Sequence, residues 1–281
     1  MIFFEKQTDL KAYLSENSDQ TKTRGFVPTM GALHAGHLSL IKRSMSENSQ
    51  TVVSIFVNPT QFNNPEDLTK YPRTIENDCK MILSLSEKII IYAPLISDLY
   101  ENQVVANHFD FDGLENQMEG KFRPGHFDGV GTVVRKLFEI VNPNRAYFGE
   151  KDFQQLQIIK KMTEKTDIKT QIVGCPIARE TNGLAMSSRN ERLTANEKLA
   201  AAIIFETLLK AKKQFVKLPI HAIKDMVAKV FSKSNYFKLE YFEIADEATL
   251  ESSRRKSSRK QYRGFIAVFC RDVRLIDTMQ F

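Results

Sequence analysis

The residues best suited to chemistry are two histidines in the segment Val27–His37, which reads VPTMGALHAGH. The segment predicts a strand, a glycine-bearing loop and the first turn of a helix. A helix N-terminus has free N–H groups and a partial positive charge, and it therefore favours an anion. His34 and His37 are three residues apart, so they share one helix face and would offer a phosphate two more donors. The pattern alone leaves a purely structural histidine pair as an equal alternative.

A second polar segment, residues 178–190, reads ARETNGLAMSSRN. Two hydroxyls and a guanidinium on a small, flexible stretch suit a lid that adds donors to a polyphosphate at the moment of reaction. The chain contains neither G-x-x-x-x-G-K-[ST] nor G-x-G-x-x-G. The sequence therefore predicts an anion site built from imidazoles rather than from a glycine cradle and lysine.

The elements that must position these residues alternate between β-rich runs and amphipathic helical stretches. Strands are predicted at 25–28, 51–57, 88–92, 146–148 and 170–173, and helices at 36–46, 74–85, 129–141 and 153–165. This alternation indicates an α/β fold with a Rossmann-like parallel sheet covered by helices. Ligands of such sheets bind at the carboxyl ends of strands. The side chains that follow predicted strands, and should converge there, are His34, Asn58, Gln61 and Lys151.

The pattern changes after Pro176. A capping box at residues 194–197 opens a helix to about residue 214, and Pro219 begins another. Strands follow at 239–244, 264–269 and 273–276, with Arg271-Asp272 as a hairpin turn. We therefore expect a nucleotide-binding Rossmann-like domain over residues 1–177 and a smaller α+β domain over residues 178–281, which carries the Met-Ser-Ser-Arg segment.

The two polar segments resemble the paired signatures of the ATP-adenylylating superfamily that includes class I aminoacyl-tRNA synthetases. Four further segments narrow the resemblance: SIFVNPTQF at 54–62, YPRT at 71–74, RPGHF at 123–127 and YFGEKDFQQL at 147–156. In this order they resemble the pantoate–β-alanine ligase family, from about residue 20 to about residue 195 and more weakly to the C-terminus. The first domain would then bind pantoate as well as nucleotide.

The resemblance implies an enzyme that condenses (R)-pantoate with β-alanine. The pantoate carboxylate would attack the α-phosphorus of ATP, giving pantoyl adenylate and pyrophosphate. The β-alanine amine would then attack the acyl carbon, giving pantothenate and AMP. Mg²⁺ on the phosphates and a homodimer are implied as well. The sequence shows no dedicated carboxylate cage for the metal, and Mg²⁺ commonly keeps waters and relies on substrate phosphates.

The resemblance also implies roles for single residues. His37 would donate a proton to the developing charge, and His34 and Lys151 would assist at the phosphates. Gln61, Gln155 and Met30 would bind the organic substrates. Core packing is an equal alternative for Met30, and Arg123 and His126 are expected to structure their loop. Ala178 stands where the family usually has valine, so only a backbone contact is carried over. The implied ATP-binding residues are Met30, Gly31, Ala32, Leu33, His34, Ala35, Gly36, His37, Gly149, Glu150, Lys151, Asp152, Ala178, Met186, Ser187, Ser188 and Arg189.

The whole chain has an ordinary globular composition, with 281 residues, 42% hydrophobic and 26% charged. No apolar run reaches the roughly 18 residues of a membrane span, and the N-terminus lacks a signal-peptide pattern. The three cysteines form no C-x-x-C pair, so neither a zinc site nor a disulfide framework is expected. A cytoplasmic location is therefore expected.

Most of the net charge of +6 lies in residues 251–263, where six basic residues accompany one acidic residue. This serine-interleaved run between two predicted strands is expected to be a solvated loop, without a nucleic acid as partner. Three other functions stay open. They are an adenylyltransferase of the same superfamily that acts on a phosphate ester, a synthetase-like RNA-binding protein and a non-catalytic nucleotide sensor.

Overall fold

The computed structural model describes residues 1–17, 21–100 and 103–281. These residues form two compact units. The first comprises Met1–Asp112, Arg123–Gly149 and Ile158–Cys175, and the second comprises Gly113–Phe122, Glu150–Gln157 and Pro176–Phe281. Two early segments therefore belong to the second unit, so the division differs from the single boundary expected at residue 177.

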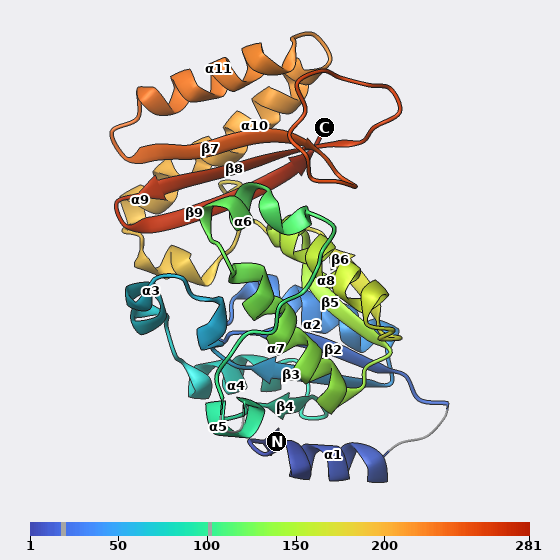
Figure 1. The fold of residues 1–281 in the computed structure, drawn as a ribbon. Helices are drawn as coiled ribbons and strands as arrows, with labels where there is room; N and C mark the ends of the chain where they lie inside the picture. The colour runs from blue at the N-terminus through green and yellow to red at the C-terminus, as the bar shows by residue number, and fades with distance from the viewer. Residues whose placement is uncertain (18–20, 101–102) are drawn as a thin grey trace. The chain divides into compact units, whose positions relative to one another are not determined.

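The first unit is built on a parallel sheet, in which the structure describes six strands (Figure 1). Their spatial order is β1 (Ile2–Phe4), β4 (Ile90–Tyr92), β3 (Gln50–Ile55), β2 (Arg24–Thr29), β5 (Arg145–Gly149) and β6 (Gln171–Cys175). Apolar residues such as Phe26, Val52 and Val53 are fully buried in the central strands, as expected where helices cover both faces. The strand order reverses between β2 and β5, and ligands of such sheets bind outside the carboxyl ends at this reversal.

Helices cover this sheet on both faces. α2 (Ala35–Glu47) packs on β2 and β5, and α7 (His126–Val141) lies on the opposite face (Figure 1). Most residues of α7 are buried, which makes it the central helix of its layer. The other helices of the unit are α1 (Gln7–Glu16), α3 (Pro65–Lys70), α4 (Ile75–Leu83) and α5 (Ile96–Tyr100), and α8 (Phe153–Lys165) begins in the second unit and ends in the first.

The second unit is built on an antiparallel sheet of three described strands, in the order β7 (Phe237–Asp246), β8 (Tyr262–Cys270) and β9 (Val273–Gln280). α10 (Ala202–Phe215) and α11 (Ile220–Ser232) pack against this sheet. Leu208, Val227 and Val268 belong to the core that the helices and strands share. The unit also contains α6 (Met118–Phe122) and α9 (Ala195–Ala200).

The predicted fold class is confirmed, since a helix-covered parallel sheet is followed by a smaller α+β part. Arg271, with a left-handed φ of 53°, forms the predicted turn between β8 and β9. The sequence analysis missed β1 and α1. The helix expected over 194–214 is also wrong, because Ala201 separates α9 from α10 with a ψ of −10° and accepts a tight i+3 bond from Ile204. None of the helices in the described ranges is long and apolar enough to cross a membrane.

Candidate functional site

The loop that follows β2 turns sharply into α2. Gly31 and Ala32 both have left-handed backbone angles, with φ of 80° and 49°. Glycine adopts this conformation without strain, whereas alanine does not, so the surroundings must hold Ala32 in place. The turn brings the first residues of α2 directly after the carboxyl end of β2, next to the reversal in strand order.

His34 and His37 cap the helix that they begin. Nδ1 of His34 accepts from the backbone N–H of Gly36 at 3.1 Å, and Nδ1 of His37 accepts from the backbone N–H of His34 at 3.3 Å. A ring nitrogen that accepts carries no proton, so each neutral imidazole carries its proton on Nε2. The ring centroids are 4.1 Å apart. The structural role and the predicted donor role are therefore compatible, because they use different nitrogens of each ring.

A carboxylate from α4 holds the same loop. The oxygens of Asp78 accept from the backbone N–H of Ala32 at 3.0 Å and of Leu33 at 2.8 Å, and Thr74 Oγ1 donates to Asp78 at 3.2 Å. Asp78 is fully buried, so these bonds also satisfy its charge. Because the N–H groups of Ala32 and Leu33 point at Asp78, a nucleotide contact from either residue would have to use other atoms.

Gln61, at the end of the 3₁₀ helix η1 (Pro59–Gln61), is buried with both ends of its amide occupied. Its Oε1 accepts from Asn58 Nδ2 at 3.2 Å, and its Nε2 lies 2.8 Å from the sulfur of Met30. Asn58 also accepts at 2.6 Å from the hydroxyl of Tyr100, whose pKa burial raises, so this hydroxyl stays a donor. Met30 and Gln61, both expected at the organic substrates, are therefore neighbours.

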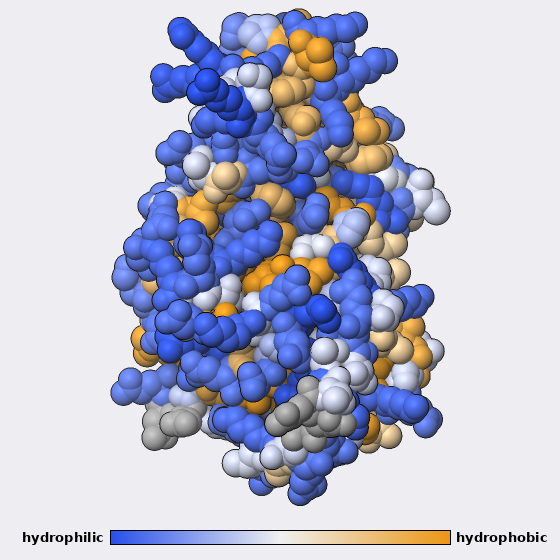
Figure 2. All heavy atoms as spheres, turned by 90° about the vertical axis from the view of Figure 1, so that its right-hand side faces the viewer, coloured by the Kyte–Doolittle hydropathy of each residue, from blue (hydrophilic) through white to orange (hydrophobic). Residues whose placement is uncertain are grey.

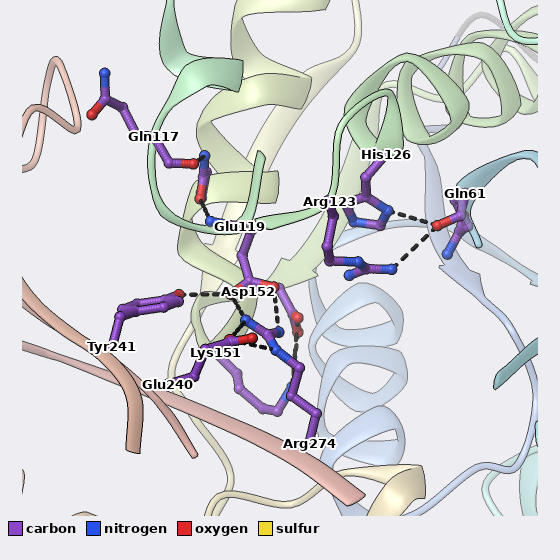
Figure 3. Close-up of polar contacts among 11 residues, drawn as sticks. Gln61, Gln117, Glu119, Arg123, His126, Lys151, Asp152, Glu240, Tyr241 and Arg274 are labelled. Carbon is purple, nitrogen blue, oxygen red and sulfur yellow. Dashed lines mark hydrogen bonds and ion pairs between the residues drawn. The ribbon is translucent and has the colours of Figure 1, made fainter. Parts of the chain in front are cut away.

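Two side chains fix the backbone of Gln61 (Figure 3). Nδ1 of His126 donates to the Gln61 carbonyl oxygen at 2.8 Å, and Arg123 donates to the same oxygen at 3.2 Å. α7 approaches η1 so closely that a Cβ on Gly129 would lie 2.3 Å from the carbonyl oxygen of Thr60. The side chains of Arg123 and His126 thus hold the backbone of Gln61, while their expected role in structuring their own loop stays a prediction.

The chain leaves β5 of the first unit and continues in the second unit as the 3₁₀ helix η3 (Glu150–Asp152). Lys151 Nζ lies 3.2 Å from a carboxylate oxygen of Asp152 (Figure 3). Glu150 pairs at 3.4 Å with Arg263 of β8, which is 113 residues away in sequence. The guanidinium of Arg263 also lies 3.9 Å from the ring centroid of Phe153. The second nucleotide segment is therefore fastened to the C-terminal sheet.

The Met-Ser-Ser-Arg segment is a short hairpin and a 3₁₀ helix rather than an irregular loop. The backbone N–H of Met186 donates to the carbonyl oxygen of Ala178 at 3.0 Å, and Gly183 turns the hairpin with a φ of 89°. Ser187 caps the 3₁₀ helix η4 (Ser188–Arg192) by accepting from the backbone N–H of Arg189. The two hydroxyls and the guanidinium thus lie at the start of one helical turn.

The paired glutamines at the start of α8 differ in their surroundings. Gln155 is half-buried. Gln154 is 3% exposed and donates to the carbonyl oxygens of Leu114 and Gln117, both at 2.9 Å. Its Oε1 accepts from the backbone N–H of Glu119 at 2.9 Å. Gln154 therefore holds the segment that enters the second unit, and Gln155 remains the candidate for substrate.

Glu119 also joins a charge network with the C-terminal sheet (Figure 3). Arg274 of β9 lies 2.6 Å from Glu119 and 2.6 Å from Glu240 of β7, and the hydroxyl of Tyr241 donates to Glu119 at 2.6 Å. Burial lowers the pKa of Arg274, but the hydrogen bonds to Glu119 and Glu240 and the charge of Glu119 together outweigh this effect and raise the pKa above its usual value. Burial and the charge of Glu119 raise the pKa of Tyr241, so this network keeps its protons at neutral pH.

The structure divides the predicted site residues between the two units. The first unit contains Met30, Gly31, Ala32, Leu33, His34, Ala35, Gly36, His37, Gln61 and Gly149, and the second contains Glu150, Lys151, Asp152, Gln155, Ala178, Met186, Ser187, Ser188 and Arg189. Sequence reasoning missed Asp78, whose only signal is its place four residues after Thr74 at the start of a helix. In the part of the chain that is described, no group of three or more His, Cys, Asp or Glu could hold a metal ion.

A parallel sheet whose strand order reverses next to β2, and a histidine pair that caps the helix after that strand, are the arrangement of α/β proteins of the nucleotide-binding kind. The family model of pantoate-beta-alanine ligase matches residues 2–280. The pantothenate synthetase of Flavobacterium psychrophilum is 61% identical over 279 residues, with 99% of each chain covered. The chain belongs to the pantoate–β-alanine ligase family.

Solved structures agree with this assignment. The pantothenate synthetase from Thermus thermophilus has a TM-score of 0.90 and 34% identity, with 100% of this chain and 99% of that chain covered. A pantoate-beta-alanine ligase from Francisella tularensis, complexed with beta-gamma ATP and beta-alanine, has a TM-score of 0.82 and 36% identity, with 100% and 97% covered. The predicted family and enzyme class are confirmed, and the alternative functions find no support.

Proposed function

We propose that the chain joins (R)-pantoate to β-alanine through a pantoyl adenylate, with ATP as the activating substrate. The histidine pair carries this proposal. Both imidazoles cap α2 through Nδ1, which leaves the proton of each ring on Nε2 at a helix N-terminus. Fixed donors at a helix N-terminus stabilise charge that develops on a phosphate. Family membership supports pantoate, β-alanine and ATP as the substrates.

In the first step, a carboxylate oxygen of pantoate attacks the α-phosphorus of ATP, and the bond to pyrophosphate breaks. This is an in-line displacement, so the protein contributes positioning and charge stabilisation rather than a nucleophile. His37 donates toward the developing charge, and His34 assists beside it. Besides its contacts with Asn58 and Met30, the Gln61 amide has a second N–H and a second oxygen lone pair, which would serve the hydroxyls and carboxylate of pantoate.

Further groups in this proposal come from residues of the second unit. Lys151 contacts the phosphates, Asp152 contacts the ribose and Gln155 contacts pantoate. Ser187, Ser188 and Arg189 add donors from the hairpin, and Ala178 offers its backbone. In the second step, the amine of β-alanine attacks the acyl carbon of the adenylate. AMP leaves with the electrons of the broken acyl–oxygen bond, and the amine loses a proton.

Four features beyond the chemistry belong to this proposal. Mg²⁺ enters with ATP, because it keeps part of its water shell and binds substrate phosphates. The chain is a homodimer in the cytoplasm, and sedimentation at the mass of one chain would contradict the dimer. Nucleic acid is not a partner, since the positive charge is confined to one short run.

An assay of AMP and pyrophosphate release tests the central claim. With Mg–ATP and pantoate alone, pyrophosphate should form without pantothenate. When β-alanine is added, AMP and pantothenate should appear in equal amounts. Release of ADP, or AMP formation that needs no pantoate, would contradict the adenylate mechanism.

A further inference from the structure

Asp277 occupies an unexpected place in β9. Residues at alternate positions of a strand share one face, and Val273 and Leu275 on this face belong to the hydrophobic core of the second unit. The same alternation places Asp277, which is 3% exposed, where an apolar residue would continue that core. A buried carboxylate at such a position requires a partner.

The partner of Asp277 is Arg179, at the base of the Met-Ser-Ser-Arg hairpin. Two guanidinium nitrogens of Arg179 lie 2.7 and 3.0 Å from the two carboxylate oxygens of Asp277. The guanidinium also donates to the carbonyl oxygen of Gly183 at 2.9 Å and lies 4.1 Å from the ring centroid of Phe205 in α10. Arg179 therefore connects the strand, the turn of the hairpin and α10 in a fixed geometry.

A contribution to the stability of the fold does not by itself explain why Arg179 and Asp277 form a buried ion pair. Removing two charges from water offsets most of their mutual attraction, and a pair of apolar residues often stabilises a core as well. An Arg–carboxylate fork differs from an apolar contact in fixing direction, because both hydrogen bonds must be made at once. The pair therefore suits a hairpin whose orientation matters.

The strand that contains Asp277 also lies against the second nucleotide segment. β9 packs against η3, which contains Lys151. Burial raises the pKa of the Asp277 carboxyl, while the hydrogen bond from Arg179 and the positive charge of Lys151 act in the opposite direction. One buried carboxylate thus pairs with the hairpin and lies on the strand that packs against η3, the other segment of the second unit that is assigned to ATP.

We propose that Asp277 is a positioning residue for the adenylation step, which it serves by fixing Arg179 and, through it, the hairpin of Ser187–Arg189 relative to Lys151. This inference rests on the proposed function, because it assumes that both segments bind ATP. It assigns Asp277 no contact with substrate. Its effect should therefore fall on the use of ATP and leave the attack of β-alanine on a finished adenylate unchanged.

The test measures the two half-reactions separately in the full-length Asp277→Asn variant. Asparagine keeps the shape of the side chain but removes the charge and one acceptor. Pantoate-dependent pyrophosphate release should slow by about tenfold or more, with a higher KM for ATP, because displaced groups lose their alignment with the phosphates. Conversion of isolated pantoyl adenylate and β-alanine into pantothenate should stay within about twofold of wild type, since adenylation is bypassed.

Arg179→Lys provides a second variant, which keeps the positive charge but loses the fork; it should show the same split between the half-reactions. Glu240→Gln is the matched control, because it weakens a different ion pair of the same sheet, that with Arg274, and should leave both half-reactions unchanged. Equal slowing of both half-reactions in Asp277→Asn and Arg179→Lys, or unchanged adenylation, would overturn the inference. A wild-type protein that makes no pantothenate would instead contradict the proposed function.

Discussion

Several residues of the site use one atom for structure and another for the proposed chemistry, which explains why structural and chemical roles coincide. Nδ1 of His34 holds the start of α2, whereas the proton of the ring lies on Nε2. Gln61 offers its side chain to substrate in the proposed function, while His126 holds its carbonyl oxygen. A substitution at such a residue can therefore remove one role and keep the other.

Replacing His34 by asparagine should separate its two roles. Asparagine is a strong N-cap residue, so its side-chain oxygen should still accept from the helix and the free energy of unfolding should change by less than about 0.5 kcal/mol. The loss of the Nε2 donor should slow pantoate-dependent pyrophosphate release by ~10²–10³-fold. Denaturant unfolding and the half-reaction assay measure the two effects.

His34→Ala is the control for this separation, because alanine removes the cap as well as the donor. It should lose about 1 kcal/mol of stability and adenylate pantoate as slowly as the asparagine variant. If the asparagine variant adenylates pantoate at the wild-type rate, the imidazole serves the helix alone.

Asp78→Asn should loosen the loop that carries the histidines. An amide has one oxygen where the carboxylate has two, so one of the N–H groups of Ala32 and Leu33 would lose its acceptor. We expect unfolding to become easier by about 1–3 kcal/mol and adenylation to slow. Hydrogen exchange measures the cause directly, since the amides of these two residues should exchange faster.

Lys80→Ala, at an exposed position of the same helix, should change neither the exchange rates nor the activity. Protection of both loop amides that persists in Asp78→Asn would show that Asp78 does not hold the loop.

At the scale of elements, the sequence predicted most of the regular strands and helices and missed the contacts between residues that are far apart in the chain. Alternation of β-rich and helical segments located strands β2 to β6, because regular elements leave a periodic signal. The contacts of Asp78 with Leu33 and of Arg179 with Asp277 span 45 and 98 residues, and no period marks them. The break between α9 and α10 was missed for a different reason, since alanine-rich sequence favours an uninterrupted helix.

Close approach of α7 to η1 is another feature without a sequence signal, and Gly129→Ala tests it. A Cβ would lie 2.3 Å from the carbonyl oxygen of Thr60 and 2.8 Å from the backbone nitrogen of Gln61, so the two elements would have to separate. We expect a lower melting temperature and a higher KM for pantoate, with the KM for ATP little changed. Steady-state kinetics with each substrate varied in turn measure this difference.

Val133→Ala controls for stability in the same helix. Val133 is 6% exposed, so its truncation creates a cavity and lowers stability without displacing Gln61. Equal rises in the KM for pantoate in the two variants would mean that lost stability, rather than a displaced Gln61, is the cause.

At the scale of the whole molecule, part of the basic run at residues 251–263 is occupied by contacts within the chain, which the sequence did not predict. The expected loop ends at Gln261, because Arg263 lies in β8, 5% exposed and paired with Glu247 at 2.8 Å. Lys256 donates to the carbonyl oxygens of Phe215 and Leu218 at the end of α10. Strongly hydrophilic side chains project from the side of the molecule on which this loop lies (Figure 2). The run thus contains exposed arginines as well as two residues, Lys256 and Arg263, that bind other parts of the same unit.

The three exposed arginines of the run, Arg254, Arg255 and Arg259, should therefore be dispensable for catalysis. Replacing all three by serine should leave pantothenate formation within about twofold, because solvated charges contribute little to a site that they do not touch. Lys256→Ser alone should instead lower the melting temperature, since it removes the cation at the C-terminus of α10.

Any binding of the wild-type chain to RNA should be weak and should fall steeply as salt rises, as counterion release requires. Sequence-selective binding that persists at physiological salt and disappears in the triple variant would show a nucleic-acid partner, contrary to the function proposed for this chain.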